Sequence, residues 1–395
     1  MRGTALLRTS ATAALAATAV LGFTAGACGR TEAVTPPAPT PIRLGAIYNL
    51  TGAQAPADGP ALDGARLAVD RINAAGGLLG RRVELLERDG VSDPSLVAAA
   101  ARGLVEAEVS AIIGLSDSAL VLAAAPAAAA GGVPFVTSGA SSPRLAAKVP
   151  GWLFLACYGD NAQAAAGAEF VSRGLGARTA AVLFAADEPA MKRLAGYFVE
   201  SFRGFGGAVL RQAPLQTGDA PAQALRRLDP GVVYLAATAA DAGAFVRELR
   251  AAGYRGVIMG GDGFDSADLR RAAAATVGPV YYTTHSSLGL ANATPAMRRF
   301  THWYASAYGR APENAFACLG FDTVDLLAAA IVAAESADPG DVRGALLATR
   351  AFSGVTGTLT YSGVGRTPRK GVTVVRAGSR PVLAAEIVPL RVPEP

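Results

Sequence analysis

Three short polar segments each follow a predicted buried strand, and their residue types suit the binding of a small charged molecule. Ser118 comes after the apolar segment 110–115 and begins a predicted helix. A ligand carboxylate at this point would meet the serine hydroxyl, nearby backbone N–H groups and the positive end of the helix dipole. A plain N-cap is the alternative interpretation, because serine is frequent at that position.

The other two segments also follow predicted strands. Gly139, Ala140 and Ser141 come after one of them, and a glycine there lets the backbone approach a ligand closely. Asp262 comes after the segment 256–261, and a carboxylate in a closing cleft needs a cation because an unpaired buried charge is costly. An ordinary polar turn and a Gly-rich turn are the structural alternatives. In the functional interpretation, Asp262 indicates a ligand with positive charge.

Motifs of catalysis and metal binding are missing from the sequence. It contains no G-x-x-x-x-G-K-[ST], no G-x-G-x-x-G and no G-x-S-x-G. The two histidines, His285 and His302, are too few and too isolated for most metal sites. An enzyme would need a nucleophile paired with a base, and no such pair is evident. We therefore expect a binding protein without cofactor or metal, and not an enzyme.

Length and composition indicate a large folded protein. The chain has 395 residues, of which 51% are hydrophobic and 17% charged, which suits two lobes with substantial cores. The net charge of +5 comes from scattered arginines without a basic block, so nucleic acid is not an expected partner. Three cysteines rule out a disulfide scaffold.

The first forty residues are predicted to direct export. Two arginines precede an apolar segment at 11–23 of signal-peptide length, and small residues lead to Cys28. This arrangement resembles a bacterial lipobox with a lipid-modified Cys28; an ordinary signal peptide with an A-x-A site is the alternative. We predict a lipoprotein signal peptide over 1–27 and a Pro-rich tether over 28–41. The exported protein would then meet the membrane only through its lipid anchor.

Strands and helices alternate along the rest of the chain. Helical periodicity predicts helices that include 60–75 and 313–336, and short antiparallel strands are expected in the tail. The predicted buried strands lie at 42–50, 81–89, 110–115, 134–139, 179–186, 232–237, 256–261 and 279–285. This order predicts an α/β fold with two doubly wound lobes, each a parallel sheet covered by helices.

An ordered set of motifs resembles the type I periplasmic binding proteins, in the branch of the leucine/isoleucine/valine-binding protein. The first strand ends in LTG, and GARLAVDRINAAGGLLG and DGVSDP follow it. Three later segments also match: IIGLSDS (112–118), VPFVTSGASSP (133–143) and NAFACLGFDTVDLL (314–327). Together these motifs extend the resemblance over nearly all of residues 42–390.

The resemblance implies two Rossmann-like lobes joined by a three-stranded hinge, with crossings near 155–160, 284–287 and 358–364. The N-terminal lobe would comprise 42–157 plus 286–360, and the C-terminal lobe 158–285 plus 361–390. The implied function is that of a monomeric, extracytoplasmic solute-binding component of an ABC importer. It would close on an amino acid or similar small molecule and dock on a permease. A ligand sensor coupled to a regulatory partner, and a binder of amides, urea or aromatic acids, remain alternatives.

The resemblance also assigns ligand-binding roles. Ser118 and Ser141 would hold a ligand carboxylate, Asp262 would pair with an ammonium group, and the carbonyl of Gly139 would accept from it. Ala140 belongs to the same loop. The first-lobe contact that follows LTG falls ambiguously within 54–58.

The departures from the family pattern alter the predicted pocket. Thr238 and Pro189 stand where relatives have aromatic residues, and Leu155 replaces an arginine, although Asp160 and Gln163 keep the pattern. Phe316 is either an apolar wall of the pocket or a core residue. Two further residues, Cys157 and Cys318, would either pair or remain buried free thiols, and free thiols are the favoured interpretation.

Overall fold

The structure, a computed structural model, describes residues 39–237 and 239–395. The predicted signal peptide, the predicted lipid-modified Cys28 and Thr238 lie outside the described residues, as does most of the predicted tether.

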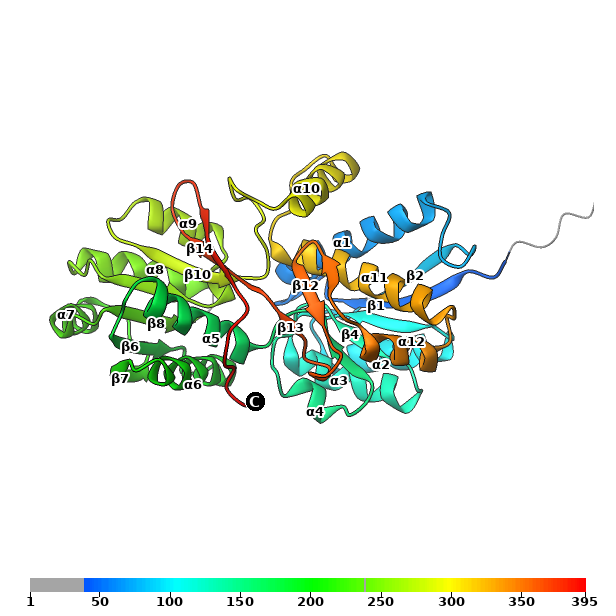
Figure 1. Ribbon diagram of the computed structural model, residues 1–395, viewed down its shortest axis with the longest axis horizontal. Coiled ribbons are helices and arrows are strands. Elements are labelled where there is room, and N and C mark those ends of the chain that lie inside the picture. Colours follow the sequence, from blue (N-terminus) through cyan, green and yellow to red (C-terminus); the bar gives the residue numbers. More distant parts are fainter. Residues whose placement is uncertain (1–38, 238) are drawn as a thin grey trace, which may run out of the picture. The chain divides into compact units, whose positions relative to one another are not determined.

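The first sheet is parallel and lies between two layers of helices. Its order is β2 (Val83–Asp89), β1 (Ile42–Tyr48), β3 (Ala111–Gly114), β4 (Phe135–Thr137) and β5 (Leu153–Leu155). The helices of one face are α1 (Ala55–Ala74), α10 (Pro295–Tyr308), α11 (Ala315–Ala334) and α12 (Pro339–Ala348), and those of the other are α2 (Pro94–Glu106), α3 (Ser118–Ala130) and α4 (Leu145–Lys148) (Figure 1). Alternation along β1 sends Leu44 and Ala46 to the first layer and Ile47 to the second.

Helices α1 and α11 cross with their backbones in direct contact. A Cβ atom at Gly64 of α1 would overlap the carbonyl of Ala317, and one at Gly320 of α11 would overlap the carbonyl of Ala61. Glycine is therefore required at both positions by packing, although both backbones are helical. This crossing fixes α1 against a helix that lies about 250 residues later in the chain.

The second sheet is mixed. Its order is β15 (Val382–Ile387), β14 (Val372–Arg376), β10 (Val280–Thr284), β9 (Val257–Gly260), β8 (Val232–Ala236), β6 (Thr179–Phe184) and β7 (Ala208–Pro214). The pairs β10–β14 and β14–β15 are antiparallel, and the other pairs are parallel. Its helices are α5 (Asp160–Glu169), α6 (Pro189–Gly204), α7 (Asp219–Leu228), α8 (Ala239–Ala251) and α9 (Ala267–Ala274). A π-helical turn, Phe170–Gly174, extends α5.

A small antiparallel sheet joins the two larger sheets. It contains β11 (Phe352–Gly354), β12 (Gly357–Thr360) and β13 (Arg369–Lys370). Next to it, Tyr361 donates from its hydroxyl to the Leu155 carbonyl (2.6 Å), and Lys370 donates from Nζ to the Ala156 carbonyl (2.8 Å). Because these contacts hold the segment 361–370 to the end of the first sheet, we propose that the third crossing lies near Gly371, later than the sequence suggests.

The predicted α/β fold with two doubly wound sheets is confirmed. Strands β5 and β7 were not predicted from the sequence. The side chains of the edge strand β7 are mostly exposed and give no apolar run. Among the described helices, α11 alone is long and apolar enough to cross a membrane, and 78% of its most apolar window is buried in the protein. Cys157 and Cys318 are buried free thiols, as favoured from the sequence.

Candidate ligand-binding site

A cavity of about 350 Å³ lies where β9 and β10 end and α1 and α11 begin. Asp262, Thr284 and His285 come from the strand ends, and Pro56 and Phe316 come from the helix starts. Ligands of open α/β sheets bind at the carboxyl ends of strands, so the position fits a binding site. Of the residues predicted from the sequence, Asp262 and Phe316 line this cavity.

The carboxylate of Asp262 is held by donors from within the protein. Its Oδ1 accepts from Nε2 of Gln163 at 3.1 Å, and its Oδ2 lies 3.0 Å from Nε2 of His285. The Asp262 N–H donates to Oε1 of the same glutamine. Burial acts to raise the pKa of Asp262, but the hydrogen bonds and the neighbouring imidazole hold it below its ordinary value. Asp262 is therefore an ionised carboxylate with its hydrogen-bond partners in place.

His285 was not predicted as a site residue. It directly follows β10, its side chain is 2% exposed, and its ring stacks on Tyr158 with centroids 4.0 Å apart. The ring of Phe316 lies 6.2 Å away on the cavity wall. The signal that could have found His285 was its place at the end of a predicted strand, at the same sheet edge as Asp262. A ligand cation was expected for Asp262 because no internal donor was evident from the sequence. The structure provides one in Nε2 of His285.

Gln163 connects Asp262 to the start of α5 and to β10. Besides its two bonds to Asp262, it donates from Nε2 to Oδ1 of Asp160 (3.0 Å) and accepts at Oε1 from the Thr283 hydroxyl (2.9 Å). The Asp160 N–H in turn donates to the carbonyl of Ser141 at 2.8 Å. Burial and the nearby Asp262 charge raise the pKa of Asp160 to about 6, against opposing hydrogen bonds. Ser141 and Asp262, both predicted from the sequence, thus belong to one hydrogen-bonded chain.

Ser118 is the first residue of α3, and the N-cap is Asp117. The Asp117 carboxylate accepts from the N–H groups of Ala119 (2.8 Å) and Leu120 (3.0 Å). The alternative interpretation of Ser118 as the N-cap is therefore wrong. Two of the N–H groups that a ligand carboxylate could use at this helix end are already bound to a carboxylate.

Gly139 and Ala140 pack behind the cavity wall, against Phe316 and Cys157 respectively. A Cβ atom at Gly139 would lie 2.6 Å from the ring of Phe316, so the glycine allows that ring to pack on the loop. Ala140 is fully buried, and its carbonyl accepts from the Cys157 thiol at 3.4 Å. The loop that contains Gly139 therefore contacts Phe316, which lines the cavity. The cavity lining does not include the predicted residues Ser118, Gly139, Ala140 and Ser141.

The other carboxylates of the cavity wall also have internal partners. Asp265 pairs with Arg270 at 3.1 Å and accepts from the Thr284 hydroxyl at 2.8 Å. Glu313 pairs with Arg310 and accepts from the Tyr304 hydroxyl at 3.2 Å. No cluster of side chains suited to a metal ion occurs among the described residues. Each carboxylate of the cavity wall therefore has a hydrogen-bond or ion-pair partner within the protein.

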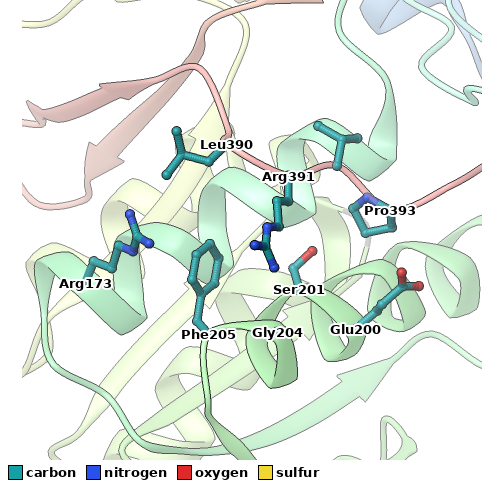
Figure 2. Close-up of a pocket in the computed structure, with 9 residues that line it drawn as sticks. Arg173, Glu200, Ser201, Gly204, Phe205, Leu390, Arg391 and Pro393 are labelled. Carbon is teal, nitrogen blue, oxygen red and sulfur yellow. The ribbon is translucent and has the colours of Figure 1, made fainter.

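A second hollow, of about 440 Å³, lies beneath the C-terminal segment (Figure 2). Leu390, Arg391 and Pro393 stand on one side of it, and Glu200 and Phe205 stand on the other. None of the residues predicted from the sequence lines this hollow, and neither does any strand-end residue of the first cavity. The 350 Å³ cavity is the candidate site for these reasons.

Comparison with known proteins identifies the family of the chain. The model of a family described as periplasmic binding protein matches residues 41–380. The chain belongs to the periplasmic binding protein family. Membership places it among extracytoplasmic solute-binding proteins rather than enzymes.

Several relatives of this periplasmic binding protein are named for amino acids. A Leu/Ile/Val-binding protein homolog of Brucella melitensis is 27% identical over 330 residues, which are 82% of this chain and 88% of the relative. A putative branched-chain amino acid ABC transporter protein from Rhodospirillum rubrum superposes with a TM-score of 0.75 at 28% identity, covering 87% of this chain and 100% of that one. The substrate-binding protein LivJ of Streptococcus pneumoniae, in complex with isoleucine, gives 0.73 at 25%, covering 88% and 99%.

Proposed function

We propose that this periplasmic binding protein is the solute-binding component of an ABC importer. It binds an amino acid or a related small molecule in the 350 Å³ cavity, and the hinge closes the two sheets on the ligand before the complex docks on a permease. Cys28 carries a lipid that anchors the monomer outside the cytoplasmic membrane. The position of the cavity, at the strand ends of one sheet and the helix starts next to the other, supports the proposal most directly.

The residues of the site have separate tasks in this proposal. Phe316 forms the apolar wall, and Gly139 leaves room for its ring. Ser118 and Ser141 face the ligand from the first sheet once the hinge closes, and Asp262 and His285 face it from the second. Gln163 positions Asp262 through two hydrogen bonds, and the Thr283 hydroxyl holds the same amide by donating to its Oε1. Thr238 remains a predicted ligand contact by its resemblance to the family position alone.

A ligand screen by thermal unfolding tests the proposed function. The full chain carrying Cys28→Ser would be heated with each of the twenty amino acids, short amides, urea, polyamines and aromatic acids. A bound solute at 100 times its Kd stabilises the folded state by about 2.7 kcal/mol, which gives a clear rise in Tm. We expect at least one small solute to do so, and Phe316→Ala to weaken it more than tenfold. A folded protein that no solute stabilises would contradict the proposal.

A further inference from the structure

The chain ends in a segment, residues 388–395, that follows β15 and runs along α5 (Figure 1). Three of its eight residues are prolines, so it has few N–H donors with which to continue the sheet. The side chains of Val388 and Leu390 are 54% and 66% exposed, and hollows of about 440 and 410 Å³ border the segment. The segment therefore buries little apolar surface, and its attachment depends on a few specific contacts.

Two hydrogen bonds join the C-terminal segment to the two ends of α5. The Leu390 N–H donates to Oε2 of Glu169, the last residue of the helix, at 3.3 Å. In the first turn, Nδ2 of Asn161 donates to the carbonyl of Pro393 at 2.8 Å. Asn161 and Pro393 are both buried, and a buried amide that lost its acceptor would be costly. The bond between Asn161 and Pro393 is therefore the stronger anchor.

The same first turn of α5 carries the groups that hold Asp262. Gln163 donates to Oδ1 of Asp262, accepts from the Asp262 N–H and also donates to Oδ1 of Asp160. Successive residues of an α-helix are about 100° apart, so Asn161 and Gln163 point to nearly opposite sides of α5. The helix begins without a side-chain N-cap. Its first turn is therefore held by the C-terminal segment on one side and by groups of the binding site on the other.

We propose that the C-terminal segment is a positioning element of the ligand-binding site, which holds the first turn of α5 through Asn161 and thereby places Gln163 and Asp262. The inference rests on the proposed function, because it concerns the same site. None of the residues 388–395 lines the 350 Å³ cavity, so the segment acts through α5 and not by touching the solute. Asn161 and Pro393 are positioning residues in this sense.

Nuclear magnetic resonance of the protein without ligand tests the inference. The chain has two histidines, and Nε2 of His285 lies 3.0 Å from Oδ2 of Asp262. The imidazole resonances of His285 therefore report on the placement of Asp262, whereas His302, an exposed residue of α10, is an internal reference.

Three variants of the Cys28→Ser protein would be compared with it at pH 7. Truncation after Arg391 removes the carbonyl that Asn161 binds, and Asn161→Ala removes the donor. Truncation after Glu394 keeps that carbonyl and is the matched control. We expect the first two variants to move the His285 resonances and to leave those of His302 in place. Hydrogen exchange in the first turn of α5 should become about tenfold faster, as expected for the loss of one hydrogen bond.

Each outcome decides the inference. Unmoved His285 resonances in the folded protein truncated after Arg391 overturn it even if the free energy of unfolding falls, because a merely structural segment would lower stability without displacing Asp262. An equal movement on truncation after Glu394 also overturns it. If truncation after Arg391 prevents folding, Asn161→Ala decides by the same resonances. No solute takes part, so a failure here leaves the proposed function standing, and a silent solute screen contradicts the proposed function alone.

Discussion

Asp58 lies in the first turn of α1 and Asp262 lies just after β9, and their surroundings move their pKa values in opposite directions. Asp58 is fully buried and accepts from the backbone N–H and the side-chain amide of Asn49, at 3.0 and 2.6 Å. No cationic side chain forms an ion pair with it within the described part of the chain, and burial raises its pKa to about 6. Asp262 has His285 at 3.0 Å, and its pKa is lowered.

The difference teaches that a neighbouring imidazole, rather than burial or amide donors alone, decides the state of a carboxylate. Asp58 holds its proton more tightly than in water, whereas Asp262 remains ionised. A sequence argument that treats every cleft aspartate as a receptor for a ligand cation cannot separate the two cases.

Removal of the partner of Asp262 should have the largest effect on this comparison. His285→Ala leaves a mostly buried carboxylate with Gln163 as its remaining side-chain donor. Breaking a buried pair from one side costs about 3–5 kcal/mol, and because Asp262 is 22% exposed we expect about 3 kcal/mol. Urea unfolding at pH 7 measures the loss, with His302→Ala as the control. A loss below about 0.5 kcal/mol would show that the pair contributes little.

A smaller effect should appear in the pH dependence of stability. The pKa of Asp58 rises from 3.8 to about 6 on folding, so its contribution is complete below about pH 4 and is lost as the pH increases through 6. This loss is on the order of 2–3 kcal/mol. In Asp58→Asn the free energy of unfolding should therefore decline less steeply between pH 4 and 7. Urea unfolding at each pH measures this decline.

Asp262→Asn is the matched counterpart of that variant. The pKa of Asp262 is lowered, so its contribution is present above its ordinary pKa and is lost as the pH falls. Asp262→Asn should therefore change the slope of unfolding free energy against pH in the opposite sense to Asp58→Asn. Equal slopes for the two variants would remove the distinction between the two carboxylates.

The smallest effect should come from a carboxylate at the surface. Asp117→Ala removes the cap of α3 and should cost about 1 kcal/mol, whereas Ser118→Ala should cost less than half of that. Thermal unfolding of both variants without ligand measures the difference. A larger loss for Ser118→Ala would return the capping role to the serine.

The sequence was sufficient for the elements that have regular periodicity. Apolar segments predicted the buried strands β1 and β3, and the long helix predicted over 313–336 corresponds to α11. Strand β7 was not predicted because it is an edge strand that exposes Arg211 and Gln212, so its sequence contains no continuous apolar segment.

The site was predictable in part. Position after a strand was enough to select Asp262, and resemblance to the family selected Phe316, which lines the cavity. His285 satisfied the same positional rule, but its partner lies 23 residues earlier, and only the pairing of β9 with β10 brings the two together. The roles of Ser118, Gly139, Ala140 and Ser141 as ligand contacts stay predictions, since hinge closure decides what those residues meet.

The glycine crossing of α1 and α11 has a mechanical consequence. Gly64 and Gly320 bring the two backbones into contact, and the N-terminal ends of the same helices place Pro56 and Phe316 on the cavity wall. The two helices should therefore move as one rigid unit, because the backbone of each helix lies directly against backbone carbonyls of the other. In the proposed closure of the hinge, Pro56 and Phe316 should therefore move together.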